Sequence, residues 1–492
     1  MRCLLLVPAW EVAEIYSPGT AGSQVSFQHP DGILSVAAYL KAQGHTLRVL
    51  DGAFRDHENI LAEVERFAPD WVGIYANTPL WNKAQNTAKD IRARMPEVFI
   101  SVGGPCPIAY RARCLEECEH LDAVDIGEGE LTSAELMDRL EKKQDLKGLH
   151  GIVYRDRSTR EIIANPPRAL IKNLDILPPP AIELLDFRER YVSPPGTYRR
   201  TPIINVHSSR GCINDCTFCF QLGANVDPKY ARTMRYRSPE HVVDEIESRV
   251  KEFGYKEVRF LDDMFIVDHK RVRRICQLIK ERNIDVTWYC SSRVDIVTPD
   301  ILKEMRSAGC WAILYGVESG VQKNLDMLRK RTTLDQIRAA VRWAKEAGIK
   351  VYTPFIFGIP GETFEEGLQS IEFAIELDPY IANFNTLTPL PGTDLYEQVQ
   401  REGTWESDTD HATFQHAAYV PSTMTKDQLI QLRSIAFKRF YGRPKYVVRR
   451  LLDIRTRSDV RALLSGAQSM AHIFLNKNIF NPDLFMKAPG DH

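Results

Sequence analysis

The stretch Ser209-Arg210-Gly211-Cys212-Ile213-Asn214-Asp215-Cys216-Thr217-Phe218-Cys219 carries three cysteines in the spacing C-x3-C-x2-C. Three thiolates presented from one tight loop can bind three irons of a cubane iron–sulfur cluster. The next cysteine along the chain is Cys276, so the loop offers no fourth thiolate to the fourth iron. An open iron can bind a ligand that is not protein, which predicts chemistry at the cluster rather than electron storage alone.

Two other interpretations of these cysteines fit the sequence less well. A structural zinc site takes four nitrogen or sulfur ligands, commonly in paired C-x2-C units, and here the second pair is missing. The nearby His207 and His241 do not follow a zinc-finger pattern. Ten cysteines in 492 residues are sparse for a disulfide framework, and three within eight positions suit a metal better.

The overall composition is that of an ordinary globular protein. A length of 492 residues predicts two or three domains, and 44% hydrophobic with 26% charged residues is typical of a soluble chain. The net charge of −1 gives no strong field toward nucleic acid, so no nucleic-acid partner is expected. Neither a signal peptide nor a bilayer-spanning run is recognisable. We therefore expect a cytoplasmic protein in a reducing compartment.

Residues 1–145 alternate short apolar runs with amphipathic stretches, which predicts βα units and a Rossmann-like parallel sheet. The expected strands are 3–7, 47–50, 71–75, 99–102 and 123–126, and the expected helices are 33–42, 60–67, 82–94 and 131–140. Ligands of such sheets lie at the carboxyl ends of the strands. There the sequence has Gly103-Gly104-Pro105 and Gly127-Glu128-Gly129-Glu130, neither of which is a dinucleotide fingerprint.

The βα alternation resumes after a connector. Residues 146–200 are expected to form a semi-rigid linker, marked by Asn165-Pro166-Pro167 and Pro178-Pro179-Pro180. In residues 201–395 the expected strands are 203–206, 258–261, 286–290, 311–315, 351–357 and 382–386. These strands predict six βα units, too few for a closed eight-stranded barrel. A partial (β/α)6, TIM-like barrel fits, with its site at the carboxyl ends of the strands.

Residues 396–492 are predicted to form a helical and basic C-terminal region. Its basic residues include Lys438, Arg439, Arg443, Lys445, Arg449, Arg450, Arg455, Arg457 and Arg461. A helix of this kind could lie on a membrane surface. The favoured interpretation is the solvated face of a helix that closes the domain, so peripheral membrane contact is possible but not favoured.

Two adjacent carboxylates, Asp262 and Asp263, follow the second expected strand of the barrel. Their place at the barrel mouth makes them candidate catalytic residues, and we expect one of them to face the cavity. The alternative is that Asp263 or Asp268 caps the following helix.

The cysteine spacing resembles the signature of the radical S-adenosylmethionine (SAM) superfamily, in which the open iron chelates SAM. The resemblance continues in Ser291-Ser292-Arg293, Gly316-Val317-Glu318-Ser319, Phe357-Gly358-Ile359-Pro360-Gly361-Glu362 and Pro389-Leu390-Pro391-Gly392-Thr393. It implies contacts to SAM from Phe218, Ser292, Arg293, Glu318, Ser319, Gly358 and Pro360. Arg293 could grip the SAM carboxylate bidentately. Each segment alone has a structural alternative: a turn, an ion pair for Glu318, a surface charge for Arg293.

The first domain resembles the cobalamin-binding domain of class B radical SAM enzymes. The segments concerned are residues 30–40, Gly44-His45-Thr46, Gly103-Gly104-Pro105 and Asp125-Ile126-Gly127-Glu128-Gly129-Glu130. The resemblance implies cobalamin contacts from Tyr75, Asn77, Thr78, Gly103, Gly104, Pro105, Gly127, Glu128 and Glu130.

One departure concerns the cobalt ligand. The D-x-H-x-x-G motif that supplies a histidine in other cobalamin proteins is absent, and neither His45 nor Asp56-His57 fits it. Bound cobalamin would then meet the loop at residues 75–79 without a histidine ligand, and weak ligation favours the reduced cobalt of methyl transfer. The same absence leaves open a domain without cobalamin. Cys106, Cys114 and Cys118 are interpreted as buried thiols rather than a second metal site.

The resemblance implies a cobalamin-dependent radical SAM methyltransferase acting on an unactivated carbon of a small, natural-product or lipid-like molecule. Its implied cofactors are a 4Fe-4S cluster, SAM and cobalamin, and its implied partner is an external electron donor such as flavodoxin or ferredoxin. A radical formed from SAM would take a hydrogen from the substrate, which would then accept a methyl group. One alternative keeps both cofactors but performs a rearrangement or oxidative cyclisation. Another is a non-catalytic iron–sulfur redox protein.

Overall fold

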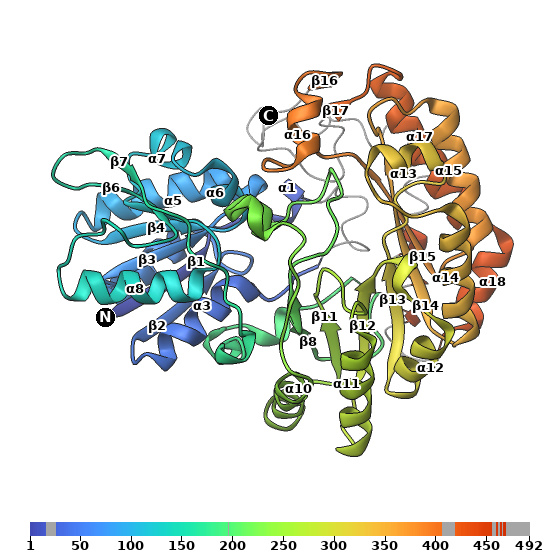
Figure 1. The fold of residues 1–492 in the computed structure, drawn as a ribbon, viewed down its shortest axis with the longest axis horizontal. Helices are drawn as coiled ribbons and strands as arrows, with labels where there is room; N and C mark the ends of the chain where they lie inside the picture. Colours follow the sequence, from blue (N-terminus) through green and yellow to red (C-terminus); the bar gives the residue numbers. More distant parts are fainter. Residues whose placement is uncertain are drawn as a thin grey trace.

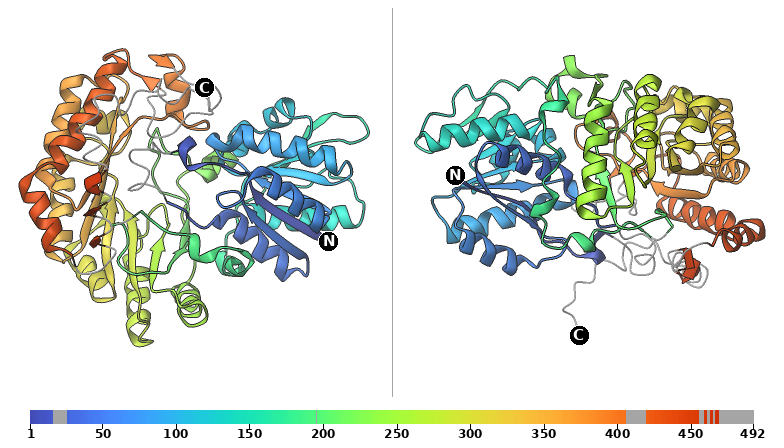
Figure 2. Two further views of the ribbon diagram at one scale, coloured as in Figure 1. Left: turned by 180° about the vertical axis from the view of Figure 1, so that it is seen from behind. Right: turned by 90° about the horizontal axis from the view of Figure 1, so that it is seen from below.

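Two large sheets, each covered by helices, lie side by side in the computed structural model of the protein (Figure 1). The structure describes residues 1–15, 26–194, 196–405 and 419–454, together with 459–460, 463–464 and 466–468. Views from behind and from below show the same two bodies, and the N-terminus lies on the body formed by the first part of the chain (Figure 2).

The first sheet has the strand order β2-β1-β3-β4-β5-β6-β7. Its parallel strands are β1 (Arg2–Val7), β2 (Thr46–Asp51), β3 (Trp71–Tyr75), β4 (Phe99–Gly103) and β5 (Ala123–Asp125). All five predicted strands are confirmed. Two antiparallel strands, β6 (Ile152–Arg155) and β7 (Ile162–Ala164), extend the sheet beyond residue 145.

Helices cover both faces of this sheet because its strands are apolar on both faces. Cys3 and Leu5 of β1 face α3 (Asp31–Ala42) and α8 (Gly129–Glu141), whereas Leu4 and Leu6 face α4 (His57–Phe67) and α5 (Trp81–Arg94). Shorter helices are α1 (Val12–Ile15), α6 (Pro105–Tyr110) and α7 (Arg113–Glu117). The Rossmann-like domain is therefore confirmed.

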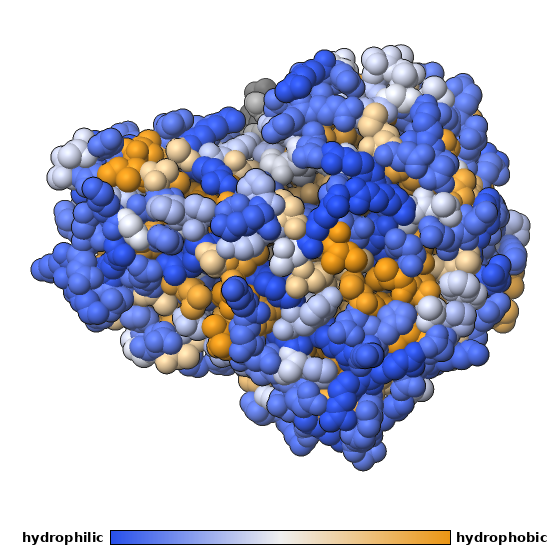
Figure 3. All heavy atoms as spheres, viewed as in Figure 1, coloured by the Kyte–Doolittle hydropathy of each residue, from blue (hydrophilic) through white to orange (hydrophobic). Residues whose placement is uncertain are grey.

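The second sheet has the order β15-β14-β13-β12-β11-β8 and is parallel throughout. The strands are β8 (Ile203–Val206), β11 (Glu257–Phe260), β12 (Thr287–Ser292), β13 (Cys310–Tyr315), β14 (Lys350–Phe357) and β15 (Ile381–Thr386). The outer helices are α10 (Pro239–Phe253), α11 (His269–Glu281), α12 (Pro299–Ser307), α13 (Gln322–Met327), α14 (Leu334–Glu346) and α15 (Phe364–Leu377). The curved sheet is the predicted partial barrel. On the face in Figure 3, apolar side chains gather over its strands.

The segment between the sheets is packed rather than extended. It forms the short helical turns η2 (Leu174–Ile176), η3 (Ile182–Leu184) and η4 (Arg188–Arg190). Ile171, Leu174 and Leu177 pack against Tyr39 and Leu131, on α3 and α8. We expected a semi-rigid linker at residues 146–200, but this segment packs against the first domain. The reason is the burial of its leucines, which fixes the segment to that domain.

The chain then forms a two-stranded ribbon of β9 (Ser209–Arg210) and β10 (Arg235–Tyr236), which brackets the cysteine loop and α9 (Leu222–Val226). Beyond the barrel lie α16 (Asp394–Val399), the pair β16 (Thr404–Trp405) and β17 (Tyr419–Val420), α17 (Lys426–Tyr441) and α18 (Pro444–Leu452). Phe440 of α17 is fully buried in the barrel's core.

The basic tail pairs in part with the barrel. Arg443 and Arg449 both donate to the Asp378 carboxylate, at 3.0 and 2.7 Å. This agrees with a helix that closes the domain, although Arg455, Arg457 and Arg461 lie outside the described residues. Within the described ranges, no helix is long and apolar enough to cross a membrane.

Candidate functional site

A cavity of about 490 Å³ lies between the two sheets. The first sheet contributes Tyr75, Gly103 and Asp125, from the carboxyl ends of β3, β4 and β5. The barrel contributes His207, just after β8, and Asp263, just after β11. Both sheets thus present the strand ends at which parallel α/β folds bind ligands.

The three cysteines lie on the loop that follows β9. Cys212 lines the cavity and is half-buried, as is Cys216, and Cys219 is reached by solvent. Gly211 precedes them with φ +94°, and a Cβ there would lie 2.1 Å from the Thr233 carbonyl oxygen. Only glycine can therefore bring the β9–β10 ribbon so close to the start of the loop.

The thiols influence one another. The Cys219 residue is exposed overall, but desolvation of its thiol, followed by the negative charges of Asp263, Cys216 and Cys212, raises its pKa to about 12. A thiol must lose its proton to bind a metal, and a bound cation would offset the repulsion among the resulting thiolates. Within the described ranges no three His, Cys, Asp or Glu side chains are spaced for a single ion. A cubane cluster places its cysteines on separate irons, so this donor set fits a cluster.

The two adjacent aspartates have different surroundings. Asp262 is buried and accepts hydrogen bonds from the Ser208 hydroxyl at 2.8 Å, the Ser208 backbone N–H at 3.2 Å and the Ser209 hydroxyl. Asp263 lines the cavity, as we expected of one of the pair. Burial, then the charge of Asp262, raises the pKa of Asp263 above its usual value. The following helix α11 is capped by Asp268, whose carboxylate accepts from the Arg271 N–H at 3.0 Å.

Arg293 follows β12 and lies beside the cysteine loop. Its guanidinium makes two hydrogen bonds of 2.9 Å to Asp295 and one of 2.6 Å to the Lys330 carbonyl. Nη1 lies 3.9 Å from the Cys216 sulfur. Asp295 thus occupies the bidentate position that the sequence suggested for a SAM carboxylate, while Nη1 points to the thiol. Ser292 is buried, and its hydroxyl donates to the Arg293 carbonyl at 3.3 Å.

Lys330 connects two of the predicted residues. Its ammonium group lies 2.7 Å from the Glu318 carboxylate and 5.7 Å from the centre of the Phe218 ring. Glu318 holds a φ of +68°, a rare conformation for a residue with a side chain. Ser319 is fully buried and hydrogen-bonds the Ser370 hydroxyl at 3.1 Å. Phe218 and Glu318 therefore both lie near the Lys330 ammonium group, whereas Ser319 packs toward α15.

The turn after β14 is shaped by Glu362, which the sequence analysis did not single out. Its carboxyl group accepts from the N–H groups of Gly358 at 2.6 Å and Ile359 at 3.2 Å, and from the Asn324 amide at 3.1 Å. Gly358 has φ +85°, and Pro360 is buried in the same turn. Burial raises the pKa of Glu362 to about 8. A Glu close behind a Gly-Ile-Pro-Gly turn was the available signal.

The first domain offers the cavity a glycine-rich stretch of backbone. Gly103, Gly104, Pro105 and Gly127 line it, together with Tyr75. Gly104 has φ +116°, and a Cβ there would lie 2.4 Å from the Ala76 carbonyl oxygen. Asn77 instead caps the turn η1 (Thr78–Leu80), accepting from the Leu80 N–H at 3.1 Å, and Thr78 is buried outside the cavity lining.

Asp125 is a further polar group that the sequence analysis did not single out. Trp71 donates to the Ser101 hydroxyl at 3.1 Å, and Ser101 donates to Asp125 Oδ2 at 2.8 Å. Asp125 Oδ1 is buried without a hydrogen-bond partner among the described residues, and burial raises the pKa of this carboxyl to about 6. A buried polar atom without a partner beside a cavity fits a ligand that supplies one. The glycine-lined wall and this atom together fit a bound cofactor.

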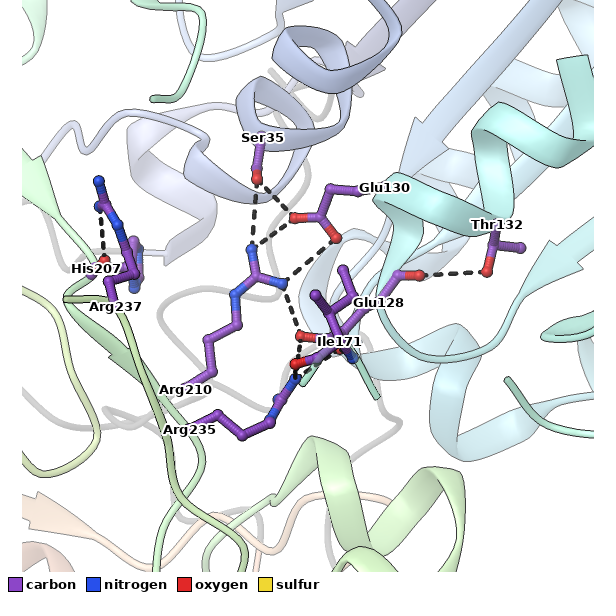
Figure 4. Close-up of polar contacts among 9 residues, drawn as sticks. All are labelled: Ser35, Glu128, Glu130, Thr132, Ile171, His207, Arg210, Arg235 and Arg237. Atoms are coloured by element: carbon purple, nitrogen blue, oxygen red, sulfur yellow. Dashed lines mark hydrogen bonds and ion pairs between the residues drawn. The ribbon is translucent and has the colours of Figure 1, made fainter. Parts of the chain in front are cut away.

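The acidic loop before α8 is already occupied by protein. Glu128 and Glu130 line the cavity, but their carboxylates pair with Arg210 and Arg235 of the β9–β10 ribbon (Figure 4). Among the described residues Cys106, Cys114 and Cys118 are buried in the first domain's core, as interpreted from the sequence.

Known families match both halves of the chain. The B12 binding domain model matches residues 20–137, and the Radical SAM superfamily model matches residues 206–374. An uncharacterized methyltransferase of Pyrococcus horikoshii is 32% identical over 462 residues, which cover 92% of this chain and 95% of the relative. An anaerobic magnesium-protoporphyrin IX monomethyl ester cyclase of Rubrivivax gelatinosus is 28% identical over 450 residues, 90% of this chain and 77% of the cyclase.

The fold is also similar to a solved structure. The cobalamin-dependent S-adenosylmethionine radical enzyme OxsB, with aqua-cobalamin and S-adenosylmethionine bound, superposes with a TM-score of 0.71 at 18% identity. The similarity covers 96% of this chain and 72% of OxsB. At this identity the likeness concerns the fold alone.

Proposed function

The chain belongs to the radical SAM enzymes that carry an N-terminal B12-binding domain, and from that premise we propose that it methylates an unactivated carbon of a small-molecule substrate. Membership implies a 4Fe-4S cluster, SAM and cobalamin as cofactors. When bound, these cofactors supply a 5′-deoxyadenosyl radical and a transferable methyl group. The observation that carries the proposal is the single cavity lined by both the cysteine loop and the first sheet's strand ends.

In this proposal the protein's residues position and shield the reactants. Cys212, Cys216 and Cys219 bind the cluster. Phe218, Glu318 and the turn at Gly358 and Pro360 shape the SAM site, with Ser292, Arg293 and Ser319 supporting it from behind. Asp263 faces the substrate. Asp262 holds Ser208 and Ser209, which come just before the cysteine loop.

The first domain has the complementary role in the proposal. Gly103, Gly104, Pro105 and Gly127 let a large flat ligand approach the backbone, while Tyr75, Asn77 and Thr78 form the loop below it. Glu128 and Glu130 support this site by pairing with Arg210 and Arg235 of the β9–β10 ribbon.

Methylation at carbon is favoured by the chemistry of the cofactors. A nucleophilic nitrogen, oxygen or sulfur could take a methyl group from SAM directly, whereas a carbon bound only to hydrogen and carbon requires a radical first. The lining of the cavity also includes the apolar side chains of Leu170, Leu174, Leu177 and Ile108 besides the Asp263 carboxyl. These apolar side chains favour a substrate with an apolar body, of the natural-product or lipid-like kind.

A second candidate function is a cyclisation or rearrangement without methyl transfer. The 28% identity to a cyclase over 90% of this chain favours it. Both candidates need an electron from outside the protein, and we propose a donor of the flavodoxin or ferredoxin class.

The two candidates are separated by the fate of SAM. We would reconstitute the protein anaerobically with iron, sulfide and hydroxocobalamin, add SAM and a reductant, and quantify 5′-deoxyadenosine and S-adenosylhomocysteine. A methyltransferase forms both, and S-adenosylhomocysteine formation disappears when cobalamin is left out. Formation of 5′-deoxyadenosine without any S-adenosylhomocysteine would reject methylation and support the cyclisation.

A further inference from the structure

An ion-pair network joins the two domains beside the cavity. It consists of Ser35 and the two carboxylates Glu128 and Glu130 from the first domain, and Arg210 and Arg235 from the β9–β10 ribbon. Figure 4 shows the Arg210 guanidinium lying between Ser35, Glu128 and Glu130. We call these five residues the interdomain network.

Arg210 is the bridge to the cysteine loop, because Cys212 is only two residues further along the chain. Its Nη1 donates to Glu128 at 2.7 Å, and its Nη2 donates to Glu130 at 2.6 Å. One guanidinium thus grips two carboxylates that flank Gly129 at the start of α8. This planar, two-sided grip fixes orientation as well as distance, which a lysine cannot do.

Arg235 reinforces the same contact from the partner strand. It is paired directly with Arg210 across the antiparallel ribbon, so both side chains leave from the same face. Its Nη1 donates to both Glu128 oxygens, at 2.9 and 2.8 Å, and to the Ile171 carbonyl at 2.8 Å. The Ile171 N–H donates back to Glu128 at 2.7 Å, which joins the connecting segment to the network.

The carboxylates of the network are buried and satisfied. Their side chains are 5% and 4% exposed for Glu128 and Glu130, and that of Arg235 is 9% exposed. Burial alone would raise the pKa of Glu130, but the charge and hydrogen bonds of Arg210 and the Ser35 hydroxyl hold it below its usual value. A buried carboxylate that loses its cation is left uncompensated. The network is therefore held together in one arrangement.

We propose that Arg210 and Arg235 are positioning residues that fix the cysteine loop against the B12-binding domain. They thereby set the separation between the iron–sulfur cluster and cobalamin. The inference rests on the cofactors of the family and not on the substrate or the methyl transfer proposed above. The alternative, suggested by the sequence, is that Glu128 and Glu130 contact cobalamin themselves.

The test measures the separation of the two cofactors directly. In the reduced protein the cluster and cob(II)alamin are both paramagnetic, and pulsed electron paramagnetic resonance reports the distribution of distances between them. We would compare the wild type with Arg210→Gln, Arg210→Lys, Glu130→Gln and the Arg210→Gln/Glu130→Gln double variant. Arg92→Gln is the matched control, since Arg92 pairs with the buried Asp122 at 2.5 Å within the first domain.

The expected result is a broadened or shifted distance distribution for Arg210→Gln and Glu130→Gln, and a smaller change for Arg210→Lys. The double variant should resemble Arg210→Gln, because loss of the guanidinium already removes the contact that Glu130→Gln weakens. The control should keep the wild-type distribution. If Arg210→Gln does not accumulate with its cluster, Glu130→Gln carries the test, because it leaves the contact between Arg210 and Glu128 in place.

Two results would overturn the proposal. An unchanged distribution in both Arg210→Gln and Glu130→Gln would show that the network does not set the separation. Weaker cobalamin binding by Glu130→Gln alone, with an unchanged distribution in Arg210→Gln, would assign the carboxylate to the cofactor instead. Neither result depends on S-adenosylhomocysteine, so failure of the proposed methylation would be seen separately.

Discussion

The two walls of the cavity differ in what they present to a ligand. The first domain presents backbone at Gly103, Gly104 and Gly127 beside the Asp125 carboxyl, whereas Glu128 and Glu130 are already paired with arginines. The barrel presents side chains, the Cys212 thiol and the Asp263 carboxylate among them. A polar group with a full set of protein partners has little to offer a ligand, whereas one without them binds or reacts.

This difference separates recognition by shape from recognition by chemistry. A wall of glycine backbone accepts a large ligand by leaving room for it, so its function is lost when a Cβ is added. A wall of thiols and carboxylates acts through its ligand atoms and charges, so its function is lost when those groups are removed. Each wall can then be damaged while the other is left intact.

The largest effect is expected from removal of one thiol. We expect Cys216→Ala to lose the 4Fe-4S cluster and all formation of 5′-deoxyadenosine, because two thiolates cannot hold it in place. Cobalamin binding should remain, since Cys216 lies on the barrel side. Iron analysis and the absorption spectrum check both statements. Cys276→Ala, a fully buried thiol of α11, is the control and should keep its iron.

The converse change is made in the first domain. Gly104→Ala places a Cβ 2.4 Å from the Ala76 carbonyl oxygen at a φ of +116°. We expect a loss of about 1–3 kcal/mol in the stability of this domain and weakened cobalamin binding, while the cluster is retained. Urea unfolding and cobalamin titration measure the two effects.

The control for that substitution is Gly148→Ala. Gly148 also has a positive φ, of +77°, but a Cβ there would meet nothing within 4 Å. It is therefore a Gly→Ala change at a positive φ without the clash. Equal cobalamin affinities of the two variants would contradict recognition by shape at Gly104.

Glu362 is a buried carboxyl of the barrel that holds the backbone turn after β14 in place, although it carries a side chain that could ionise. Its pKa rises from 4.5 to about 8 through burial, so the folded protein binds a proton that the unfolded chain releases. The contribution of Glu362 to the stability of the fold should therefore be largest below pH 4.5, and it should fall as the pH rises toward 8.

Glu362→Gln should remove this dependence of stability on pH. The stability of the variant relative to the wild type should therefore increase by a few kcal/mol between pH 5 and a pH above 8. Thermal unfolding at several pH values measures it. Glu366→Gln, at the start of α15 where the carboxylate pairs with Lys323 at 2.7 Å, serves for comparison. If the stabilities of the wild type and Glu362→Gln change in parallel with pH, the N–H donors keep the buried carboxyl ionised in the folded protein.

The parallel strands of both sheets could be predicted because they are buried on both faces and read as apolar runs. Trp71–Tyr75 and Ile203–Val206 match the prediction residue for residue. Strand β7 (Ile162–Ala164) is short and partly exposed, and so left no such run. The three cysteines were predicted as cluster ligands from their spacing, and Asp263 was predicted to face the cavity from its place after a strand.

The contacts of the cavity were harder to foresee. Arg210 and Glu128 are 82 residues apart, and no periodic pattern links two single charges at that separation. Glu128 and Glu130 were instead predicted as cofactor contacts from the resemblance of their segment to cobalamin-binding domains. Asp295, two residues after Arg293, was visible in the sequence as a competing carboxylate. Asp125 could not be distinguished from an exposed strand end, because its hydrogen-bond partner Ser101 lies 24 residues earlier on the neighbouring strand.

The smallest predicted effect concerns the carboxylate on the barrel wall. Asp263 lies close enough to Cys212 and Cys219 for its charge to raise the pKa of both thiols. A negative charge there also opposes the addition of an electron to a cluster. Asp263→Asn should therefore raise the cluster's reduction potential by on the order of 50 mV, which is about 1 kcal/mol for one electron. Asp268→Asn removes the same charge from the start of α11, where asparagine caps as well as aspartate. If the two variants shift the potential equally, Asp263 has no special access to the cluster, and the contrast between the two walls of the cavity would rest on the thiols alone.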